Sequence, residues 1–469
     1  MGVDVLLIKP DCSDIAVMPP LGLGYLASTL MHSGISVTIL DNTLFEYDDH
    51  ALAAFIRERA PLALGITAVT PTIQRALEIA SIAKRVDADI LVVMGGPHPS
   101  AMAEEILRSG AVDVVVRGEG EVTFKEIVLN LKDNNRDYSG IPGCVFKDSH
   151  KNVVSAGLRP FLDDLDVLPF PDMDHAPLEL YYKRGGNFGI TQRRTRSLPI
   201  MASRGCPSRC TFCQRSMGEK FRIRSSENIV DELLYRNKKC NVSEFNFLDD
   251  NFTVDKKNVI STCDRIHAKG LKITFRFPNG VREDFLDGDI LAALRSVGCY
   301  HLDFGIESGS QKVLDLMKKG KRIEKIEQKV RLCKKYGFTL SASFLFGTPG
   351  ETLGDMEETI RFAQSLPLDS ASFGIVIPFP GTELYKEVVR KGYLVAHDYT
   401  YYNPTIDHFR ALIITPDWSE SDLLRIVRTA NRRFFFRPKQ VAKLLPALLT
   451  RANFSKFAKA LGKNCLQGS

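Results

Sequence analysis

The residues of this sequence best suited to chemistry are three cysteines that stand close together. Cys206, Cys210 and Cys213 lie in the segment ASRGCPSRCTFCQRS, with the spacing C-x3-C-x2-C. Three thiolates in one loop can each bind one iron of a [4Fe–4S] cluster, which leaves the fourth iron free to bind a small molecule. The alternative is a zinc site, but structural zinc takes four protein ligands, and no fourth cysteine or histidine stands nearby in the sequence. The spacing therefore predicts an iron–sulfur cluster with one open iron.

Polar residues and glycines follow several apolar runs downstream of the cysteines. They are Asp249 and Asp250 in LDDNF, Arg282 in NGVRED, Glu307 in FGIESGS, and Phe346 and Gly347 in FLFGTPGET. In barrels of alternating strands and helices, residues that follow the strands gather at one end and carry the chemistry. Other interpretations stay open: an Asx turn or a helix N-cap for the aspartates, a pair with a core arginine for Glu307, and a solvated or core-paired position for Arg282.

These motifs resemble those of the radical S-adenosylmethionine (SAM) superfamily, in which an aromatic residue precedes the last cysteine, as Phe212 does here. The resemblance implies that SAM binds the open iron through its amino and carboxylate groups. It implies that the reduced cluster splits SAM into methionine and a 5′-deoxyadenosyl radical. It also implies SAM contacts for Phe212 and for the residues after the strands. The two aspartates would lie near the amino group, Arg282 at the carboxylate, Glu307 at the ribose or the amino group, and Gly347 beside adenine, with Phe346 as a neighbour.

Residues 196–385 contain the elements that would position these groups. Apolar runs with helical patterns between them predict six strands: LPIMASR, EFNFLDD, ITFRFPN, YHLDFGIES, TLSASFLFG and SASFGIVIP. Strands that alternate with helices form parallel sheets. We therefore expect a (βα)6 partial TIM barrel with the motifs at the carboxyl ends of its strands.

Residues 1–135 alternate strands and helices in the same way. Short runs rich in Val, Ile and Leu, such as VDVLLIKP and DILVVMGG, suit strands that are buried on both faces. Right-handed crossovers would then give a doubly wound parallel sheet, so both halves of the chain belong to the α/β class. The glycines do not form the GxGxxG pattern of dinucleotide sites and stand instead in PPLGLGYLA, MGGPHPS and RGEGE.

Ahead of such a barrel, this domain is similar to the cobalamin-binding domain of the B12-dependent radical SAM enzymes. The resemblance implies that cobalamin lies near residues of GITAVTPT, MGGPH and RGEGE, namely Thr67, Thr70, Gly95, Gly96, Gly118 and Glu119. The DxHxxG motif, which supplies a cobalt ligand in many B12 proteins, is absent. A histidine on the lower face of the corrin is therefore not expected, and His98 is interpreted as a loop residue. The alternative is a domain that keeps the fold without binding cobalamin.

Two further segments complete the expected organisation. Residues 136–195 contain several prolines and many aspartates, and we interpret them as a linker between the domains. Residues 386–469 are mostly helical and basic, and RFFFRPKQVAKLL has an amphipathic pattern. Such a helix can make a peripheral contact with an anionic membrane, or it can pack on the barrel and turn its charges to water.

Composition limits the class of protein further. The chain of 469 residues is 44% hydrophobic and 25% charged, as is typical of globular proteins. A net charge of +6 without a basic stripe interleaved with aromatic residues gives no reason to expect a nucleic-acid partner. We interpret the segment MGVDVLLIKPDC as a first β-strand and not as a secretory signal, and without an apolar run of sufficient length we expect no transmembrane helix. Ten thinly spread cysteines suit a cytoplasmic protein with a metal site.

The sequence thus predicts a radical SAM C-methyltransferase that transfers a methyl group via cobalamin to an unactivated carbon. The expected substrate is a small molecule: a tetrapyrrole, an isoprenoid or other lipid, or a secondary metabolite. Flavodoxin or ferredoxin is the expected electron donor. One alternative is a cobalamin-associated radical SAM enzyme that closes or rearranges a ring, or oxidises its substrate, without methyl transfer. Another is a non-catalytic iron–sulfur or corrinoid-binding protein. The sequence does not identify the catalytic residues that would contact the substrate.

Overall fold

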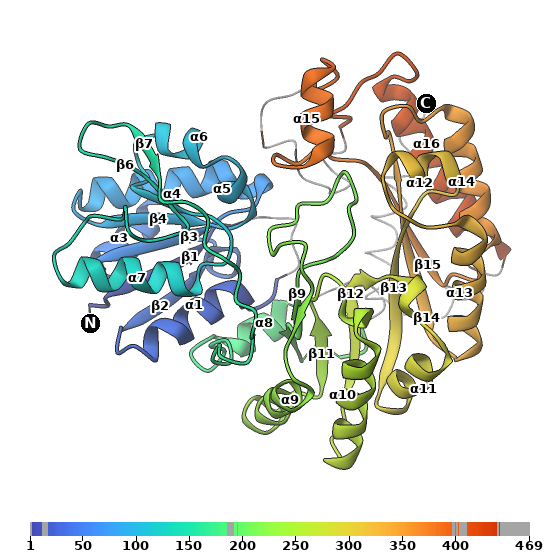
Figure 1. Ribbon diagram of the computed structural model, residues 1–469, viewed down its shortest axis with the longest axis horizontal. Helices are drawn as coiled ribbons and strands as arrows, with labels where there is room; N and C mark the ends of the chain where they lie inside the picture. The colour runs from blue at the N-terminus through green and yellow to red at the C-terminus, as the bar shows by residue number, and fades with distance from the viewer. Residues whose placement is uncertain are drawn as a thin grey trace.

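The structure is a computed structural model that describes residues 2–11, 17–184, 192–194, 196–395, 399, 402, 410–438 and 440. Within these residues the chain forms two large α/β units, which lie at the left and the right of Figure 1. The expected α/β class with two parallel sheets is confirmed.

Seven described strands form the N-terminal sheet, in the order β2–β1–β3–β4–β5–β6–β7. The first five are parallel: β1 (Val5–Lys9), β2 (Val37–Asp41), β3 (Ala63–Thr67), β4 (Leu91–Gly95) and β5 (Val114–Val116). Both faces are buried, because Leu6 and Ile8 pack into one apolar cluster while Val5 and Leu7 pack into another. Helices α3 (Asp49–Arg59), α4 (Ile73–Val86) and α6 (Ala103–Arg108) cover the first face, and α1 (Leu21–Met31) and α7 (Glu121–Lys132) cover the second. The domain is therefore doubly wound.

Part of the expected linker belongs to this sheet. Strands β6 (Cys144–Lys147) and β7 (Val153–Ser155) form a hairpin that pairs antiparallel with β5. Cys144 and Val145 are buried in the two clusters beside the parallel strands. The interpretation of residues 136–195 as a linker was wrong over this stretch, because the apolar runs CVF and VVSA supply a further pair of strands to the sheet.

Six described strands form the second sheet, all parallel, in the order β8–β11–β12–β13–β14–β15. Their bounds are β8 (Ser197–Ile200), β11 (Glu244–Phe247), β12 (Thr274–Val281), β13 (Cys299–Glu307), β14 (Thr339–Phe346) and β15 (Ser370–Ile375). Each overlaps one of the six runs expected from the sequence. A short antiparallel ribbon, β9 (Ser203–Arg204) with β10 (Arg222–Ile223), follows β8.

One face of this sheet is covered by helices that alternate with the strands. They are α9 (Ser226–Cys240), α10 (Lys256–Ala268), α11 (Gly288–Ser296), α13 (Ile323–Lys335), α14 (Leu353–Ser365) and α16 (Glu420–Phe435). Side chains at the ends of the strands start several of these helices: Ser225 caps α9, and Thr352 and Asp355 form a capping box on α14. In Figure 1, α13, α14 and α16 lie on the side of the sheet away from the N-terminal domain.

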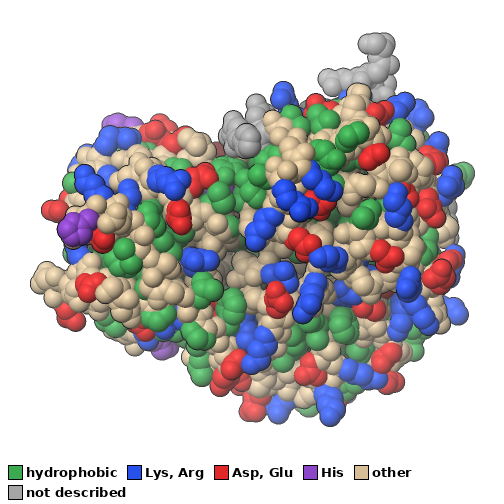
Figure 2. All heavy atoms as spheres, turned by 45° about the horizontal axis from the view of Figure 1, so that its top comes forward, with side chains coloured by type: hydrophobic (Ala, Val, Ile, Leu, Met, Phe, Trp, Pro, Cys, Tyr) green, Lys and Arg blue, Asp and Glu red, His purple; other side chains and the backbone are tan. Residues whose placement is uncertain are grey.

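Shorter elements lie in the connections. They are α2 (Asn42–Phe45), α5 (Pro97–Ala101), α8 (Leu178–Arg184), α12 (Gln311–Leu316), α15 (Glu383–Arg390) and the 3-10 turns Thr70–Thr72, Phe252–Val254 and Glu283–Phe285. In the C-terminal segment, Phe434 of α16 packs on Phe373 of β15, with ring centroids 5.8 Å apart. The predicted amphipathic basic segment begins at Arg433, and its residue 439 and its part beyond 440 lie outside the described residues. None of the described helices is both long and apolar enough to cross a membrane. On the face shown in Figure 2, Lys and Arg side chains are interspersed with Asp and Glu.

Candidate active site

The cysteines lie on a loop whose two ends are joined by the β9–β10 ribbon. Arg204 and Arg222 are directly paired in this ribbon, so residues 205–221 form a closed loop at the carboxyl end of the first barrel strand. Gly205 begins the loop with φ +82°, and a Cβ there would collide with the carbonyl oxygen of Lys220. Only glycine suits this turn. The cysteine spacing is therefore presented by a defined loop at the end where barrel chemistry is expected.

The loop is also held from the other side of the barrel. The Thr211 N–H donates to the carbonyl of Met317 (3.0 Å), and the Thr211 carbonyl accepts from the Leu384 N–H (2.9 Å). Met317 directly follows α12, after β13, and Leu384 lies in α15, after β15. Cluster ligands on this loop would thus be connected to strands at both edges and in the middle of the sheet.

The thiols of the loop are suited to binding iron. Cys206, Cys210 and Cys213 are free cysteines. The hydrogen bond from the Cys213 thiol, together with the nearby charges of Lys319 and Arg282, lowers the pKa of Cys210 to about 6. The thiolate is the form that ligates metal. Across the described parts of the chain, no three His, Cys, Asp or Glu side chains are grouped to hold one metal ion. A [4Fe–4S] cluster makes a different demand, because each thiolate takes a separate iron.

Glu307 lies beside this loop and is paired with a lysine. Its carboxylate is 2.7 Å from the Lys319 ammonium, and both side chains are less than a tenth exposed. Lys319 also stands 5.5 Å from the centre of the Phe212 ring. Glu307 ends β13 with φ +72°, a conformation that side chains other than glycine seldom adopt. The alternative for Glu307 was a pair with a core arginine, and the partner in the structure is instead Lys319, from the basic run KKGKR.

Arg282 connects the cysteine loop to the rest of the barrel. It donates to the Ser208 hydroxyl (2.7 Å) and to the Lys319 carbonyl (3.2 Å), and it forms an ion pair with Asp284 (2.8 Å). Its side chain is half-buried, so the core-paired interpretation is the one that the structure shows. Arg282 and Glu307 therefore lie in one charged layer next to the cysteines.

Asp249 supports the backbone that leads into the cysteine loop. Its Oδ1 accepts hydrogen bonds from the Ala202 N–H (3.1 Å), the Ser203 hydroxyl (2.6 Å) and the Ser203 N–H. Burial raises the pKa of Asp249 to about 7. Its Oδ2 and the Nδ2 of the neighbouring Asn251 are buried without a hydrogen-bond partner in the described structure. Asp250 accepts a hydrogen bond from the Gly205 N–H, and desolvation of its carboxyl raises its pKa.

Phe346 and Gly347 serve the packing of the barrel. The Phe346 ring is fully buried and nearly parallel to Phe373, which places it on the helix-covered face. Any contact with SAM would come from its backbone. Gly347 has φ +92°, and a Cβ there would lie 3.1 Å from Leu423 of α16. Its N–H donates to Glu351 (2.7 Å), a buried carboxyl whose pKa is raised by burial to about 8.

Five of the residues predicted to contact cobalamin meet at the carboxyl edge of the N-terminal sheet. Thr67, Thr70, Gly95, Gly96 and Gly118 follow or end the neighbouring strands β3, β4 and β5. Ligands of open α/β sheets bind at this edge. A Cβ at Gly96 (φ +108°) would lie 2.7 Å from the Ala68 carbonyl oxygen, so the backbone is closely packed there.

His98 is buried at the same edge. Its Nδ1 lies 3.1 Å from the Thr70 hydroxyl, and its ring contacts Tyr399 edge-on, with centroids 4.6 Å apart. Burial lowers its pKa to about 4. The interpretation of His98 as a loop residue was wrong, because it lies in α5 and is fully buried.

Glu119 has a different partner from the one expected. Its carboxylate is 3.1 Å from Arg204 and 2.9 Å from Arg222, the paired residues at the ends of the cysteine loop. Glu121, two residues later, is 2.7 Å from Arg204. All four side chains are less than a tenth exposed. These two arginines and two glutamates, which we call the interdomain clamp, join the cobalamin-like domain to the loop. No local motif predicts them, because the partners are about a hundred residues apart in the sequence.

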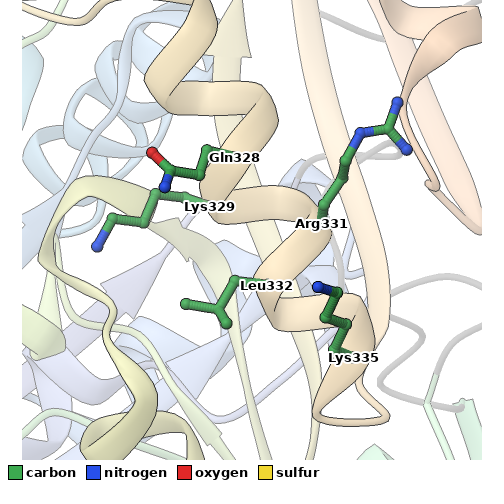
Figure 3. Close-up of a pocket in the computed structure, with 5 residues that line it drawn as sticks. All are labelled: Gln328, Lys329, Arg331, Leu332 and Lys335. Atoms are coloured by element: carbon green, nitrogen blue, oxygen red, sulfur yellow. The ribbon is translucent and has the colours of Figure 1, made fainter.

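A separate open pocket lies on the outer surface of the barrel. Figure 3 shows that its lining residues come from the single helix α13: Gln328, Lys329, Arg331, Leu332 and Lys335. Lys329 donates to the Leu286 carbonyl (2.6 Å), and Arg331 pairs with Glu327 (2.7 Å). Because α13 covers the helical face of the sheet, this pocket is remote from the cysteine loop.

Each of the two α/β units matches a known protein family. Residues 16–128 match the B12 binding domain, and residues 200–363 match the Radical SAM superfamily. The chain belongs to the cobalamin-dependent radical SAM methyltransferase family. A relative from Pyrococcus horikoshii, an uncharacterized methyltransferase, is 35% identical over 91% of this chain and 89% of its own length. An anaerobic magnesium-protoporphyrin IX monomethyl ester cyclase from Rubrivivax gelatinosus is 30% identical over 89% of this chain and 74% of its own.

Solved structures share the fold. The radical SAM methyltransferase TsrM from Kitasatospora setae, with cobalamin and a [4Fe–4S] cluster bound, aligns with a TM-score of 0.75 at 20% identity, over 94% of this chain and 92% of its own. The cobalamin-dependent SAM radical enzyme OxsB aligns with a TM-score of 0.74 at 18% identity, over 98% of this chain and 70% of its own.

The residues present fit the cofactors of this family: a [4Fe–4S] cluster, SAM and cobalamin. The thiols at one loop, one with a lowered pKa, suit the cluster. The unpartnered buried atoms of Asp249 and Asn251 suit a polar ligand at the mouth of the barrel. The carboxyl edge of the N-terminal sheet, where β3, β4 and β5 end, is the edge at which ligands of open α/β sheets bind.

Proposed function

We propose that this protein is a C-methyltransferase that uses both cofactor systems on one small-molecule substrate. The cluster and SAM supply radical cleavage chemistry, and cobalamin supplies a methyl carrier. The overall reaction converts the substrate C–H and two SAM molecules, with two electrons from an external donor, into the methylated product, 5′-deoxyadenosine, methionine and S-adenosylhomocysteine. A flavodoxin or ferredoxin is the proposed donor.

The interdomain clamp is the observation that carries this proposal. Glu119 and Glu121 lie at the edge of the N-terminal sheet where cobalamin would bind. Their partners Arg204 and Arg222 stand at the two ends of the cysteine loop. The clamp therefore holds the loop against the corrin edge of the other domain. Both reactive centres can then act on one substrate between the domains, as methyl transfer requires.

We assign the individual roles as follows. Cys206, Cys210 and Cys213 hold the cluster. Arg282 and Lys319 keep positive charge beside it, which favours thiolates and a SAM carboxylate. The remaining SAM contacts are proposed for Phe212, Asp249, Asp250, Glu307 and the backbone at 346–347, and the cobalamin contacts for Thr67, Thr70, Gly95, Gly96 and Gly118.

The product ratio tests the proposal. The reconstituted protein is incubated anaerobically with SAM, cobalamin, reductant and a small-molecule extract of cells that make it. We expect 5′-deoxyadenosine and S-adenosylhomocysteine in equal amounts above the background without extract. If 5′-deoxyadenosine forms without S-adenosylhomocysteine, methyl transfer is contradicted. If neither forms, the protein is a binding protein and not an enzyme.

A second function is favoured by the relative from Rubrivivax gelatinosus. That protein is a cyclase, and it is 30% identical over most of this chain. Radical ring closure or oxidation without methyl transfer would use the same cysteines and SAM contacts. It would give 5′-deoxyadenosine alone, so the same assay separates the two functions.

A further inference from the structure

Strands β14 and β15 carry the same four-residue sequence in direct register. Each contains Ser-Ala-Ser-Phe, and the pairs are Ser341 with Ser370, Ala342 with Ala371, Ser343 with Ser372 and Phe344 with Phe373. Successive residues of a strand point to opposite faces. The repeat therefore gives the two strands one face of serines and one face of Ala and Phe.

The Ala and Phe face is part of the core. Phe344 and Phe373 are stacked with centroids 5.3 Å apart, and Phe373 contacts Phe434 of α16. The opposite face is open, because Ser343 and Ser372 are exposed. Parallel sheets are normally covered on both faces. Exposed hydroxyls on adjacent strands of such a sheet indicate a face left for a ligand.

The adjacent strand β13 adds a charged and an unpartnered group to this face. Asp303 aligns with Ser341 and is about a quarter exposed. His301 is fully buried, with Nε2 3.1 Å from both the Ser341 hydroxyl and the Asp303 carboxylate. Its Nδ1 is buried without a hydrogen-bond partner in the described part of the chain. A buried, unsatisfied ring nitrogen is costly unless a ligand or water completes it.

The face leads to the predicted cofactor site. Gly305 aligns with Ser343, and a Cβ on Gly305 would lie 2.6 Å from the Glu307 carboxylate and 3.2 Å from the Lys319 ammonium. The absence of a side chain at Gly305 therefore lets the ion pair beside Phe212 lie directly against the strand, next to Ser343. A molecule on the serines would reach the end of the barrel that holds the cysteine loop.

We infer that the serine face, defined as Asp303, Ser341, Ser343, Ser370 and Ser372, binds the substrate, and that this substrate is a neutral, hydroxyl-rich small molecule. This inference rests on the proposed function. Serine hydroxyls both donate and accept, and Asp303 accepts, so they match a ligand with several hydroxyl groups. Asp303 is the charged member of the serine face, and its carboxylate does not favour an anionic substrate. A porphyrin or an isoprenoid would leave these polar groups unsatisfied.

Fractionated extract tests the inference. Protein-free extract is separated into an organic-soluble fraction, an anionic fraction retained on an exchanger and a neutral aqueous fraction. Each is added to the reconstituted enzyme with SAM and cobalamin, and formation of 5′-deoxyadenosine and S-adenosylhomocysteine is measured. We expect only the neutral aqueous fraction to stimulate 5′-deoxyadenosine formation. Stimulation by another fraction, or by none, overturns the inference. Missing S-adenosylhomocysteine with neutral stimulation contradicts only the proposed methyl transfer.

Two nearly isosteric double variants isolate the hydroxyl groups. Ser343→Val with Ser372→Val and Ser343→Thr with Ser372→Thr add the same bulk, but only threonine keeps the hydroxyl. Two hydrogen bonds make a difference of at least about tenfold. The valine variant should need at least about tenfold more neutral fraction for half-maximal stimulation than the threonine variant, with KM for SAM within about twofold in both. Iron content and circular dichroism confirm folding. Equal values for both variants overturn the inference.

Discussion

Removing Arg204 should separate SAM cleavage from methyl transfer. Arg204 is 5% exposed and lies 3.1 Å from Glu119 and 2.7 Å from Glu121. Loss of one partner from a buried ion pair costs about 3–5 kcal/mol. In Arg204→Met, Glu119 keeps Arg222 at 2.9 Å, and Glu121 loses its only ion pair among the described residues. The lower end, about 3 kcal/mol, is therefore expected. At about 1.4 kcal/mol per tenfold, the docked state of the two domains becomes about a hundredfold less favoured.

Two quantities are measured for each variant: the free energy of unfolding, and the ratio of the two products S-adenosylhomocysteine and 5′-deoxyadenosine. We expect the free energy of unfolding to fall by about 3 kcal/mol, and the ratio of S-adenosylhomocysteine to 5′-deoxyadenosine to fall well below one. Arg215→Met is the matched control. Arg215 lies on the same loop and pairs with Glu219, but this pair is partly exposed, at 31% and 58%, so its loss should cost about 0–1 kcal/mol. A double-mutant cycle with Glu121→Gln measures the coupling directly.

Two results would refute this reasoning. One is a coupling energy between Arg204 and Glu121 below about 0.5 kcal/mol, the level of additive sites. The other is an Arg204→Met protein that loses the full 3 kcal/mol and still makes both products in equal amounts. The clamp would then stabilise the fold without aligning the two reactions.

Further predictions concern the cluster, a buried carboxyl and a glycine. Cys210→Ala should abolish SAM cleavage while cobalamin binding, followed by absorbance, stays near wild type; surviving cleavage would contradict the cluster assignment. Burial raises the pKa of Glu351 from 4.5 to about 8, so between these values the folded protein keeps a proton that the unfolded chain has released, and stability falls as pH rises. In Glu351→Gln the free energy of unfolding should fall less steeply with pH, by up to about 1.4 kcal/mol per pH unit. If the free energy of unfolding of the two proteins changes with pH in parallel, this prediction is contradicted. Gly96→Ala should lower stability by more than Gly110→Ala and should also weaken cobalamin binding. Both glycines have positive φ, but only a Cβ at Gly96 meets a neighbour, the Ala68 carbonyl oxygen at 2.7 Å. Equal losses of stability in the two variants would show that backbone strain alone acts.

Local sequence patterns predicted much of the fold and the cysteine loop at the centre of the candidate active site. The six barrel strands and the five parallel strands of the N-terminal sheet follow from apolar runs and their spacing. Cys206, Cys210 and Cys213 are neighbours in sequence, so their spacing alone predicted a shared loop. The hairpin at 144–155 was missed because prolines on either side suggested a linker, although two short apolar runs joined by a polar turn are typical of a hairpin.

Contacts between distant segments could not be predicted in this way. Glu119 was assigned to cobalamin because its motif follows a strand at the expected edge of the sheet, yet its carboxylate pairs with arginines more than eighty residues away. Phe346 ends a barrel strand, but which face its ring joins depends on where α16 packs. Lys319 becomes visible as the partner of Glu307 only when the loop after β13 folds back.

The clamp also limits how far the two domains can be treated as modules. Two separate families describe them, yet Arg204 and Arg222 lie in one domain and their carboxylate partners in the other. A chain cut ahead of residue 196 would present two unpaired arginines at the base of its cysteine loop. An exchanged N-terminal domain would have to bring a matching pair of acids at the same turn. Domain swaps among relatives should therefore succeed or fail on the residues at 119 and 121, and less on overall identity.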